Sequence, residues 1–497
     1  MLKNQVIALL PLLITGVTSI VLMLYLAWKR NHLISMIITI IGLFFASISL
    51  YILKYIGFVE ISTLLSIDGF YLLFSSLILF SNISICIFAY IWLRKYEYNN
   101  QEEFYLLLLI ITMGGLLLAS TNNLSSLFLG IELISMPLLG LIGYDIHHNK
   151  QSLEACVKYT VLSAISSSFF LFGIALIYAQ YGQLNFYEIG YYFNLHQDYK
   201  LTILGFGLLI SSIGFKLSIV PFHLWTPEIY QKTSDPVTAL LSTTSKVAIM
   251  GALARLLISI SITDNEQIRM VLETMAFLSI LVGNIMALHE TNIKKLLAYS
   301  SIAHFGYFLI ALIFLHKNQF SIETINLYSI YYLFSNLGIF GIITLISSSC
   351  YSEKECSYEI SYYRGLFWRY PIITLLMTIM ILSLAGLPLT IGFIGKLYII
   401  MLSIMLHFWL GTLAIIIGSI ISIYYYLRII INLYLSENLK LHPTSNFVIP
   451  INYTSRIVLL LLIIITIIIV IFGIFPQHLI EITQLITQPL LFFFSSS

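Results

Sequence analysis

Residues 212–227 read SIGFKLSIVPFHLWTP, an apolar run that is interrupted by a lysine and a proline. Pro221 has no backbone N–H, and its ring pushes away the carbonyl of Leu217, which lies one turn back and next to Lys216. We therefore expect a helix that is broken inside an apolar segment, with a charged side chain beside the break.

Residues 382–396, LSLAGLPLTIGFIGK, repeat this arrangement further along the chain. Gly386 and Pro388 should loosen the helix at Leu384 in the same way, and Lys396 follows about two turns later. Interrupted helices in corresponding positions of two halves are typical of transporters built from inverted repeats. The two segments therefore predict two related halves, each with one discontinuous helix.

The composition places most of the chain in a lipid bilayer. Of the 497 residues, 59% are hydrophobic and only 9% are charged, whereas soluble domains are about half apolar and about a quarter charged. A net charge of +2 is too small for a nucleic-acid surface, so we expect no nucleic-acid partner. The four cysteines form no CxxC or ferredoxin-like run, and His147 and His148 have no further ligands nearby. We expect neither a metal nor a redox cofactor in this chain.

Hydropathy predicts an all-α polytopic membrane protein with about 14 transmembrane helices. The expected spans lie near residues 5–28, 33–57, 69–93, 104–120, 123–144, 154–182, 201–230, 236–261, 269–289, 293–316, 322–348, 371–402, 406–435 and 456–484. We interpret helices 4–8 and 9–13 as two inverted five-helix repeats, with helices 7 and 12 discontinuous. The expected units are an N-terminal three-helix segment (1–103), a first antiporter-like repeat (104–261), a second (262–435), and a C-terminal helix and tail (436–497).

Positive charge is concentrated on one side of the predicted bundle. The loops after odd-numbered helices contain Lys29, Arg30, Arg94, Lys95, Lys150, Lys232, Lys294, Lys295, Lys354, Arg364, Arg369, Lys440 and Arg456. The opposite side has only Lys3, Lys54, Lys200, Arg269 and Lys317. Because cytoplasmic loops retain Lys and Arg, both termini should lie outside, in the periplasm of a bacterium or the intermembrane space of a mitochondrion.

Two charges at membrane depth could form a proton switch. Glu132 lies in FLGIELISMP, one turn before Pro137. A charge at the bilayer centre costs at least about 2.5 to 3.5 kcal/mol on insertion scales. Each of these two charged residues should therefore have a stabilising partner or a function. Burial disfavours a charged lysine and a nearby carboxylate favours it, so moving Glu132 relative to Lys216 would load or release a proton. Each residue also has an alternative structural role. Lys216 could extend its ammonium group to the membrane surface, and Glu132 could form a local hydrogen bond.

Polar stripes accompany the remaining candidates. They comprise Thr238, Ser242 and Lys246 on the eighth helix, Ser300, His304 and Tyr307 on the tenth, and Ser419, Ser422 and Tyr426 on the thirteenth. Residues four apart share a helix face, so water could line these stripes. Lys246, His304 and Lys396 are therefore further candidates for a relay. A satisfied core histidine and a lysine that reaches the surface are the alternatives for His304 and Lys396.

Other polar residues fit structural roles. We expect Glu154 and Lys158 to form an ion pair, and Asp235 with Ser234, before Pro236, to cap a helix. His223 could bind the broken backbone or pack beside Trp225. Whether His223, Lys158 and Glu154 contribute to a proton path is left open by the sequence.

Five segments in order resemble subunit N of the proton-pumping NADH:quinone oxidoreductase, respiratory complex I, a family of antiporter-like membrane-arm subunits. They are LFLGIELISMPLLGLIGY, SLEACVKYTVLSAISSSFFLFGIALIYAQYG, GFKLSIVPFHLWTPEIYQ, ETNIKKLLAYSSIAHFGY and YRGLFWRYPIITLLMTIMILSLAGLPLTIGFIGK. The resemblance extends from the first helix to about residue 480. It implies a translocase subunit with 14 helices that binds no cofactor itself, while the complex as a whole uses FMN, iron–sulfur clusters, NADH and quinone.

The resemblance also implies roles for matching residues. Glu132 would be the helix 5 glutamate, Lys216 its helix 7 partner, Lys246 the central lysine, His304 a linking residue and Lys396 the terminal helix 12 lysine. A lysine at position 396 favours subunit N, because the sister subunit M and related cation/proton antiporters have a glutamate there. The implied activity is proton translocation coupled to electron transfer from NADH to quinone in other subunits.

The resemblance implies a setting as well. The partners would be other membrane-arm subunits, including subunits M and K, and the lipid bilayer, with no direct NADH or quinone site. The location would be the bacterial inner (plasma) membrane with both termini periplasmic, and the mitochondrial inner membrane is the alternative. A stand-alone cation/proton antiporter subunit and a structural scaffold with vestigial charges are the competing functions.

Overall fold

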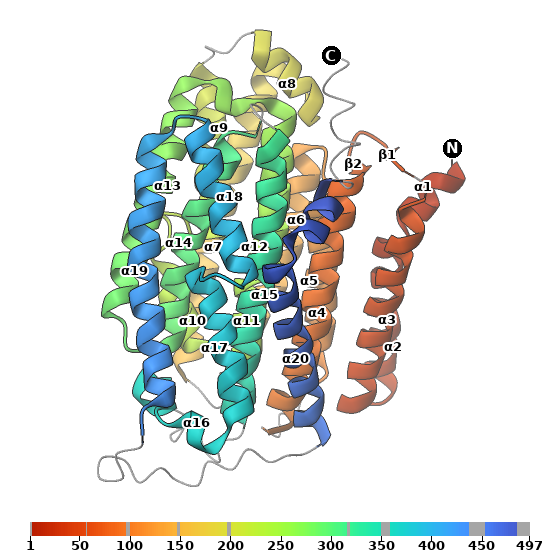
Figure 1. Ribbon diagram of the computed structural model, residues 1–497. Helices are drawn as coiled ribbons and strands as arrows, with labels where there is room; N and C mark the ends of the chain where they lie inside the picture. Colours follow the sequence, from red (N-terminus) through yellow and green to blue (C-terminus); the bar gives the residue numbers. More distant parts are fainter. Residues whose placement is uncertain are drawn as a thin grey trace.

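The computed structural model describes residues 2–55, 57–95, 100–146, 150–195, 200–315, 319–348, 358–436 and 453–484. Most helices run alongside one another in one bundle, as Figure 1 shows. They are α1 Leu2–Ala8, α2 Leu10–Trp28, α3 His32–Leu53, α4 Gly69–Lys95, α5 Glu103–Ser120, α6 Leu124–Ile142, α7 Lys150–Tyr181, α8 Phe186–Leu195, α9 Lys200–Leu217, α10 Trp225–Lys232, α11 Asp235–Ser242, α12 Thr244–Ile260, α13 Glu266–His289, α14 Ile293–Ile313, α15 Gln319–Ser348, α16 Leu366–Arg369, α17 Pro371–Ala385, α18 Ile391–Met405, α19 Trp409–Tyr434 and α20 Tyr453–Ile474.

The predicted fold class is confirmed. Within the described residues, 13 spans are long and apolar enough to cross a bilayer, counting Asp235–Ile260 as one. Two shorter apolar helices, α17 and α18, follow one another where the sequence predicted its twelfth helix. The chain is an all-helical polytopic membrane protein. Its described residues also include two small elements that were not predicted: an antiparallel hairpin of β1 Val59–Ile61 and β2 Leu65–Ile67, and the short helix α8.

Both predicted breaks are present. Helix α9 ends at Leu217 and α10 begins at Trp225, while α17 ends at Ala385 and α18 begins at Ile391. Gly386 adopts a φ of +78°, in the left-handed region that glycine enters without steric cost. The carbonyl of Leu384, which no longer has a helical partner, accepts a hydrogen bond from the Tyr331 hydroxyl at 3.1 Å.

A further interruption divides the helix that the sequence predicted over residues 236–261. Helix α11 ends at Ser242 and α12 begins at Thr244. The hydroxyls of Thr243 and Ser242 both donate to the carbonyl of Ala239, at 2.6 and 3.1 Å. Hydroxyls that bond back to the preceding turn compete with the helix ladder and bend it. Lys246 therefore lies one turn after a third irregular point.

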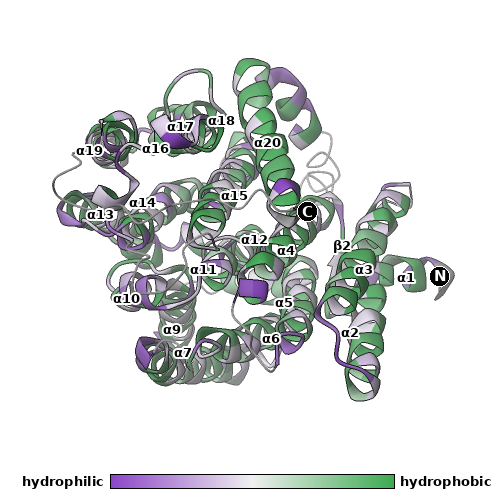
Figure 2. Ribbon diagram, turned by 90° about the horizontal axis from the view of Figure 1, so that it is seen from below, coloured by the Kyte–Doolittle hydropathy of each residue, from purple (hydrophilic) through white to green (hydrophobic). Residues whose placement is uncertain are grey.

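The bundle has a buried centre and a peripheral layer. Within an 18-residue stretch of each span, 94–100% of the residues are buried in Asp235–Ile260, Ile293–Ile313 and Phe320–Ser348, whereas only 17% are buried in Leu10–Trp28. Figure 2, which looks along the helices, shows α11 and α12 inside the bundle and α2 with α3 at one margin. A helix that is apolar on its exposed side is suited to lipid or to a partner helix. The polar candidates on α12 and α14 therefore lie in the protein interior.

Two polar contacts attach the hairpin region to this centre. Asp68, just after β2, forms a buried ion pair with Arg255 of α12, with 2.6 Å between Oδ1 and Nη2. The same guanidinium donates to Ser66. Because a buried charge is costly without a partner, this pair fixes the hairpin against the last turns of α12.

Candidate functional site

Lys216 is buried at the end of α9, next to the first break. Its ammonium group donates to the hydroxyl of Ser163 on α7 at 2.6 Å. The rings of Tyr159 and Phe215 lie beside it, each with a centroid 5.8 Å from Nζ. Only 6% of the residue is exposed. The break is stabilised by Trp225, whose indole N–H donates to the carbonyl of Phe215 at 3.0 Å.

Glu132 lies on α6, which contacts α7. Its Oε2 accepts a hydrogen bond from Ser135 at 3.0 Å, while Oε1 is buried with no hydrogen-bond partner among the described residues. No ion pair within 4.0 Å joins Glu132 to Lys216 in the described chain, since the lysine bonds to Ser163 instead.

Lys246 occupies the centre of the bundle. It is 1% exposed, and its Nζ donates to the hydroxyl of Ser301 on α14 at 3.0 Å. The rings of Phe305 and Tyr230 lie within 4.7 and 5.5 Å of Nζ. Its described surroundings thus combine a neutral hydroxyl with aromatic faces, which stabilise a cation without fixing it in an ion pair.

Helix α14 continues from this contact toward the second break. Ser301, His304 and Tyr307 follow at intervals of three, so they share one face of the helix. His304 is 3% exposed, and its Nδ1 is 2.7 Å from the hydroxyl of Tyr328 on α15. The ring of Tyr307 is 5.9 Å from Nζ of Lys396. One helix face therefore connects the surroundings of two buried lysines.

Lys396 lies on α18 and reaches back to the end of α17. Its Nζ donates to the carbonyl of Ala385 at 2.8 Å and to the hydroxyl of Ser422 on α19 at 3.2 Å. The residue is 5% exposed. The second break thus supplies an oxygen acceptor because helix α17 stops at Ala385.

An amide joins three helices beside this lysine. Asn284 of α13 donates to the hydroxyl of Tyr307 at 3.1 Å and accepts from the hydroxyl of Tyr425 on α19 at 3.1 Å. Sequence reasoning did not identify Asn284, nor the partners Ser163, Ser301 and Tyr328. The sequence feature that could have indicated these partners is the recurrence of small hydroxyl residues on the buried faces of these apolar helices.

The cap predicted at Ser234 and Asp235 is confirmed in position, because α11 begins at Asp235, but neither side chain makes a capping hydrogen bond. Ser234 is the N-cap residue of α11. Asp235 instead forms an ion pair with Lys294, with 2.5 Å between Oδ1 and Nζ and side-chain exposures of 0% and 1%. Lys294 was counted among the loop charges, but it is buried and also donates to the carbonyl of Thr233 at 2.9 Å. An ammonium group stabilises a carboxylate more than the backbone N–H groups of a helix N-terminus do, so Asp235 pairs with Lys294.

The expected ion pair of Glu154 and Lys158 is confirmed at 2.8 Å. Lys158 also contacts Glu228 at 2.6 Å, and Lys232 contacts Glu154 at 2.8 Å. These four side chains connect α7 to α10, the helix that follows the first break. The connection is a structural role that the sequence indicated only in part.

Three remaining sequence predictions concern metals, cysteines and His223. His147, His148, Cys350 and Cys356 lie outside the described residues. Among the residues that the structure does describe, no group of three His, Cys, Asp or Glu side chains is arranged to hold a metal ion. His223 is buried in the first break, at 8% exposure.

Residues 121–422 match the family described as NADH:quinone oxidoreductase/Mrp antiporter, transmembrane. This match covers more than half of the chain and includes both breaks and all five candidate residues. The chain belongs to this family. It is an antiporter-like, proton-translocating membrane subunit of a complex of the complex I or Mrp type.

Solved structures resemble the chain over nearly its whole length. A chain of respiratory complex I from Thermus thermophilus is 28% identical, with a TM-score of 0.79 and coverage of 95% of this chain and 98% of that one. A chain of the archaeal membrane-bound sulfane sulfur reductase is 23% identical (TM-score 0.82, coverage 97% and 96%). One from the Mrp complex of Dietzia sp. DQ12-45-1b is 18% identical (TM-score 0.83, coverage 97% and 96%). The last two similarities concern the fold alone.

Proposed function

We propose that this chain is subunit N of a proton-pumping NADH:quinone oxidoreductase. In this role it translocates a proton through Glu132, Lys216, Lys246, His304 and Lys396 when quinone is reduced elsewhere in the complex. The observation that carries the proposal is the face of α14 that lies against both Lys246 and Lys396. A continuous series of buried polar groups is what a proton needs to cross an apolar interior.

The acceptors of the three lysines support a carrier role. Lys216, Lys246 and Lys396 donate to Ser163, Ser301, Ser422 and the carbonyl of Ala385, all of which are neutral. A serine hydroxyl accepts from an ammonium group and can also donate to a neutral amine. These surroundings therefore accommodate both protonation states, as a transferred proton requires.

Two observations favour subunit N over its relatives. Position 396 is a lysine, where the resemblance expects a glutamate in subunit M and in the cation/proton antiporters. The second observation is the 28% identity with a chain of respiratory complex I over 95% of this chain, which supports membership of such a complex. Within this proposal, residues 104–261 and 262–435 are the two repeats, and α14 of the second repeat contacts Lys246 of the first.

The proposal extends to the setting of the chain. Its partners would be the neighbouring membrane-arm subunits, among them M and K, and FMN, the iron–sulfur clusters, NADH and quinone would be bound by other subunits. The excess of Lys and Arg on one side supports an orientation with both termini in the periplasm of a bacterial inner membrane.

The first experiment tests membership of the complex. We expect deletion of the gene to abolish NADH-driven quinone reduction in membranes or to uncouple it from proton pumping. A stand-alone antiporter would leave both intact, and that result would overturn the assignment.

The second experiment tests the relay. We expect Lys246→Ala in the assembled complex to reduce proton uptake into membrane vesicles per quinone reduced. Lys54→Ala is the matched control, because this lysine is exposed at the end of α3. Equal proton pumping by both variants would favour a scaffold role with vestigial charges.

A further inference from the structure

Asn284 is a buried amide on α13, outside the five residues of the proposed relay. The residue is 0% exposed, and α13 packs against both α14 and α19. Its amide nitrogen donates to the carbonyl of Ile280, one turn back, at 2.7 Å and to the hydroxyl of Tyr307 at 3.1 Å. Its amide oxygen accepts from the hydroxyl of Tyr425 at 3.1 Å. The amide therefore uses both of its N–H hydrogens and its oxygen.

The carbonyl of Ile280 determines which way this amide points. A carbonyl oxygen can only accept, so the nitrogen and not the oxygen of Asn284 must face it. The second amide hydrogen then goes to the oxygen of Tyr307, and Tyr425 must donate to the amide oxygen. Because the Tyr307 oxygen accepts from Asn284, its own hydrogen is directed to another side. A residue outside the relay therefore sets the direction of the Tyr307 O–H group.

The Tyr307 hydroxyl lies close to the contact that Lys396 makes on α19. A Cβ at Gly418 would lie 2.5 Å from the Tyr307 hydroxyl oxygen and 2.8 Å from Nδ2 of Asn284. Ser422, one turn further along α19, accepts from Lys396 at 3.2 Å. The Tyr307 ring is itself 5.9 Å from Nζ of Lys396. The hydroxyl and the ammonium group therefore lie against one face of α19, about one turn apart.

We propose that Asn284 is a positioning residue for Lys396 that acts through Tyr307. By donating to the Tyr307 oxygen, the amide turns the hydroxyl hydrogen away from α13 and toward the interior that contains Lys396. An ammonium group can only donate, whereas the neutral amine that remains after proton release can accept a hydrogen bond. A hydroxyl that is held as a donor therefore suits the neutral form of Lys396. The inference rests on the proposed relay, since it names a residue that serves one of its members.

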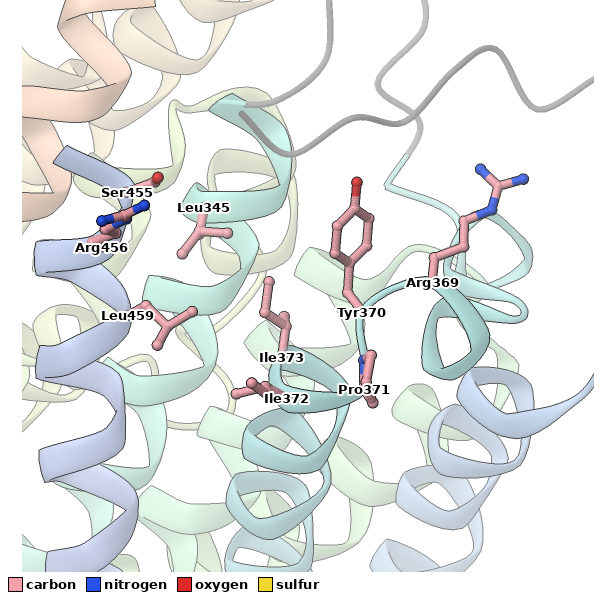
Figure 3. A pocket seen from close by; sticks show the side chains of 9 residues that line it. All are labelled: Leu345, Arg369, Tyr370, Pro371, Ile372, Ile373, Ser455, Arg456 and Leu459. Carbon is pink, nitrogen blue, oxygen red and sulfur yellow. The ribbon is translucent and has the colours of Figure 1, made fainter. Parts of the chain in front are cut away.

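An apolar cavity of about 200 Å³ lies at the other end of α17 and is separate from this arrangement. Figure 3 shows Ile372 and Ile373, in the first turn of α17, beside the cavity. Lys396 instead bonds to Ala385, the last residue of this helix. The residues that line the cavity include neither Asn284 nor its partners. Substitutions of Asn284 therefore change hydrogen bonds near the second break and leave the lining of this cavity as it is.

The test measures the rate of proton uptake into membrane vesicles, normalised to the amount of assembled complex. Asn284→Leu removes the amide at similar volume, and Tyr307→Phe removes only the hydroxyl. One hydrogen bond of ordinary strength corresponds to about a two- to tenfold change, so we expect each variant to slow proton uptake by that factor. Because Asn284 acts through Tyr307, the double variant should be no slower than Tyr307→Phe alone.

Asn336→Leu is the matched control. Asn336 is also a buried helix amide, at 1% exposure, and it likewise donates to the carbonyl four residues back, that of Tyr332, at 3.0 Å. This variant should leave proton uptake unchanged, even where its unfolding midpoint falls as far as that of Asn284→Leu. Asn284→Ser, which has a smaller side chain, replaces Asn284→Leu if the latter does not assemble, and the same loss is expected.

Two results would overturn the positioning role. One is equal proton uptake by the Asn284 and Asn336 variants, and the other is a double variant whose loss is the product of the two single losses. Lys396→Ala separates this failure from failure of the relay. Normal proton uptake by Lys396→Ala would overturn the proposed function itself, and the positioning role with it. A loss in Lys396→Ala together with normal uptake by Asn284→Leu would overturn only the role of Asn284.

Discussion

The buried pair of Asp235 and Lys294 allows a quantitative prediction. Lys294→Met removes the positive partner of a carboxylate that is 0% exposed and 2.5 Å away. Asp235 would keep hydrogen bonds from Ser347 and, at 3.4 Å, from Tyr358, but no counter-charge. Removing one member of a buried ion pair costs about 3 to 5 kcal/mol, which lowers the ratio of folded to unfolded chain by more than about a hundredfold.

The assay is denaturant unfolding of the purified chain in micelles, followed by circular dichroism. Lys295→Met is the matched control, because this neighbouring side chain is partly exposed, and it should change the midpoint little. The double variant Asp235→Asn/Lys294→Met should recover much of the loss, since it leaves no unpaired charge. The reasoning is refuted if Lys294→Met is no worse than Lys295→Met, or if the double variant is no more stable than Lys294→Met.

Two further predictions concern packing and the relay. A Cβ at Gly306 would lie 2.8 to 2.9 Å from backbone atoms of α13, so Gly306→Ala should destabilise the chain by about 1 to 3 kcal/mol in the same unfolding assay. Gly207→Ala, where nothing lies within 4 Å, should be neutral or stabilising, and equal losses would contradict the close-packing argument. Ser163→Ala removes the described acceptor of Lys216 and should slow proton pumping by the assembled complex. Ser168→Ala on the exposed side of α7 should not, so equal rates would argue against this contact.

The fold was predictable where its causes are local. Pro221 and Pro388 break their helices wherever those helices pack, because the missing N–H and the ring clash belong to the residue itself. The interruption at Thr243 was not predictable, because it depends on which way hydroxyl groups turn in the folded chain. Helix α8 lies between the sixth and seventh predicted spans, where the sequence predicted no helix, although Phe186, Ile189 and Phe193 form a buried face. Its ten residues are too few for a hydropathy window to detect.

The site was predictable in its residues and not in its contacts. An ionisable side chain inside an apolar helix is visible in any sequence, so Lys246 could be identified without a structure. Its partner Ser301 lies 55 positions away, and α14 has several other polar residues that pattern alone would favour equally. Asp235 shows the opposite failure. Its sequence context fits a cap, but the packing of α14 brings Lys294 to it, and a tertiary ion pair overrides the local preference.

The buried lysines divide into two kinds by what accepts their hydrogen bonds. Lys294 contacts a carboxylate, which stabilises the ammonium form only, so this side chain is held charged and in place. Lys216, Lys246 and Lys396 contact described hydroxyls and a carbonyl, and their nearest described rings offer an aromatic face. Neutral acceptors favour the charge less strongly, so the two protonation states of these lysines differ less in free energy. In the proposed relay, Lys216, Lys246 and Lys396 are therefore suited to carry a proton, whereas Lys294 is suited to a fixed structural charge.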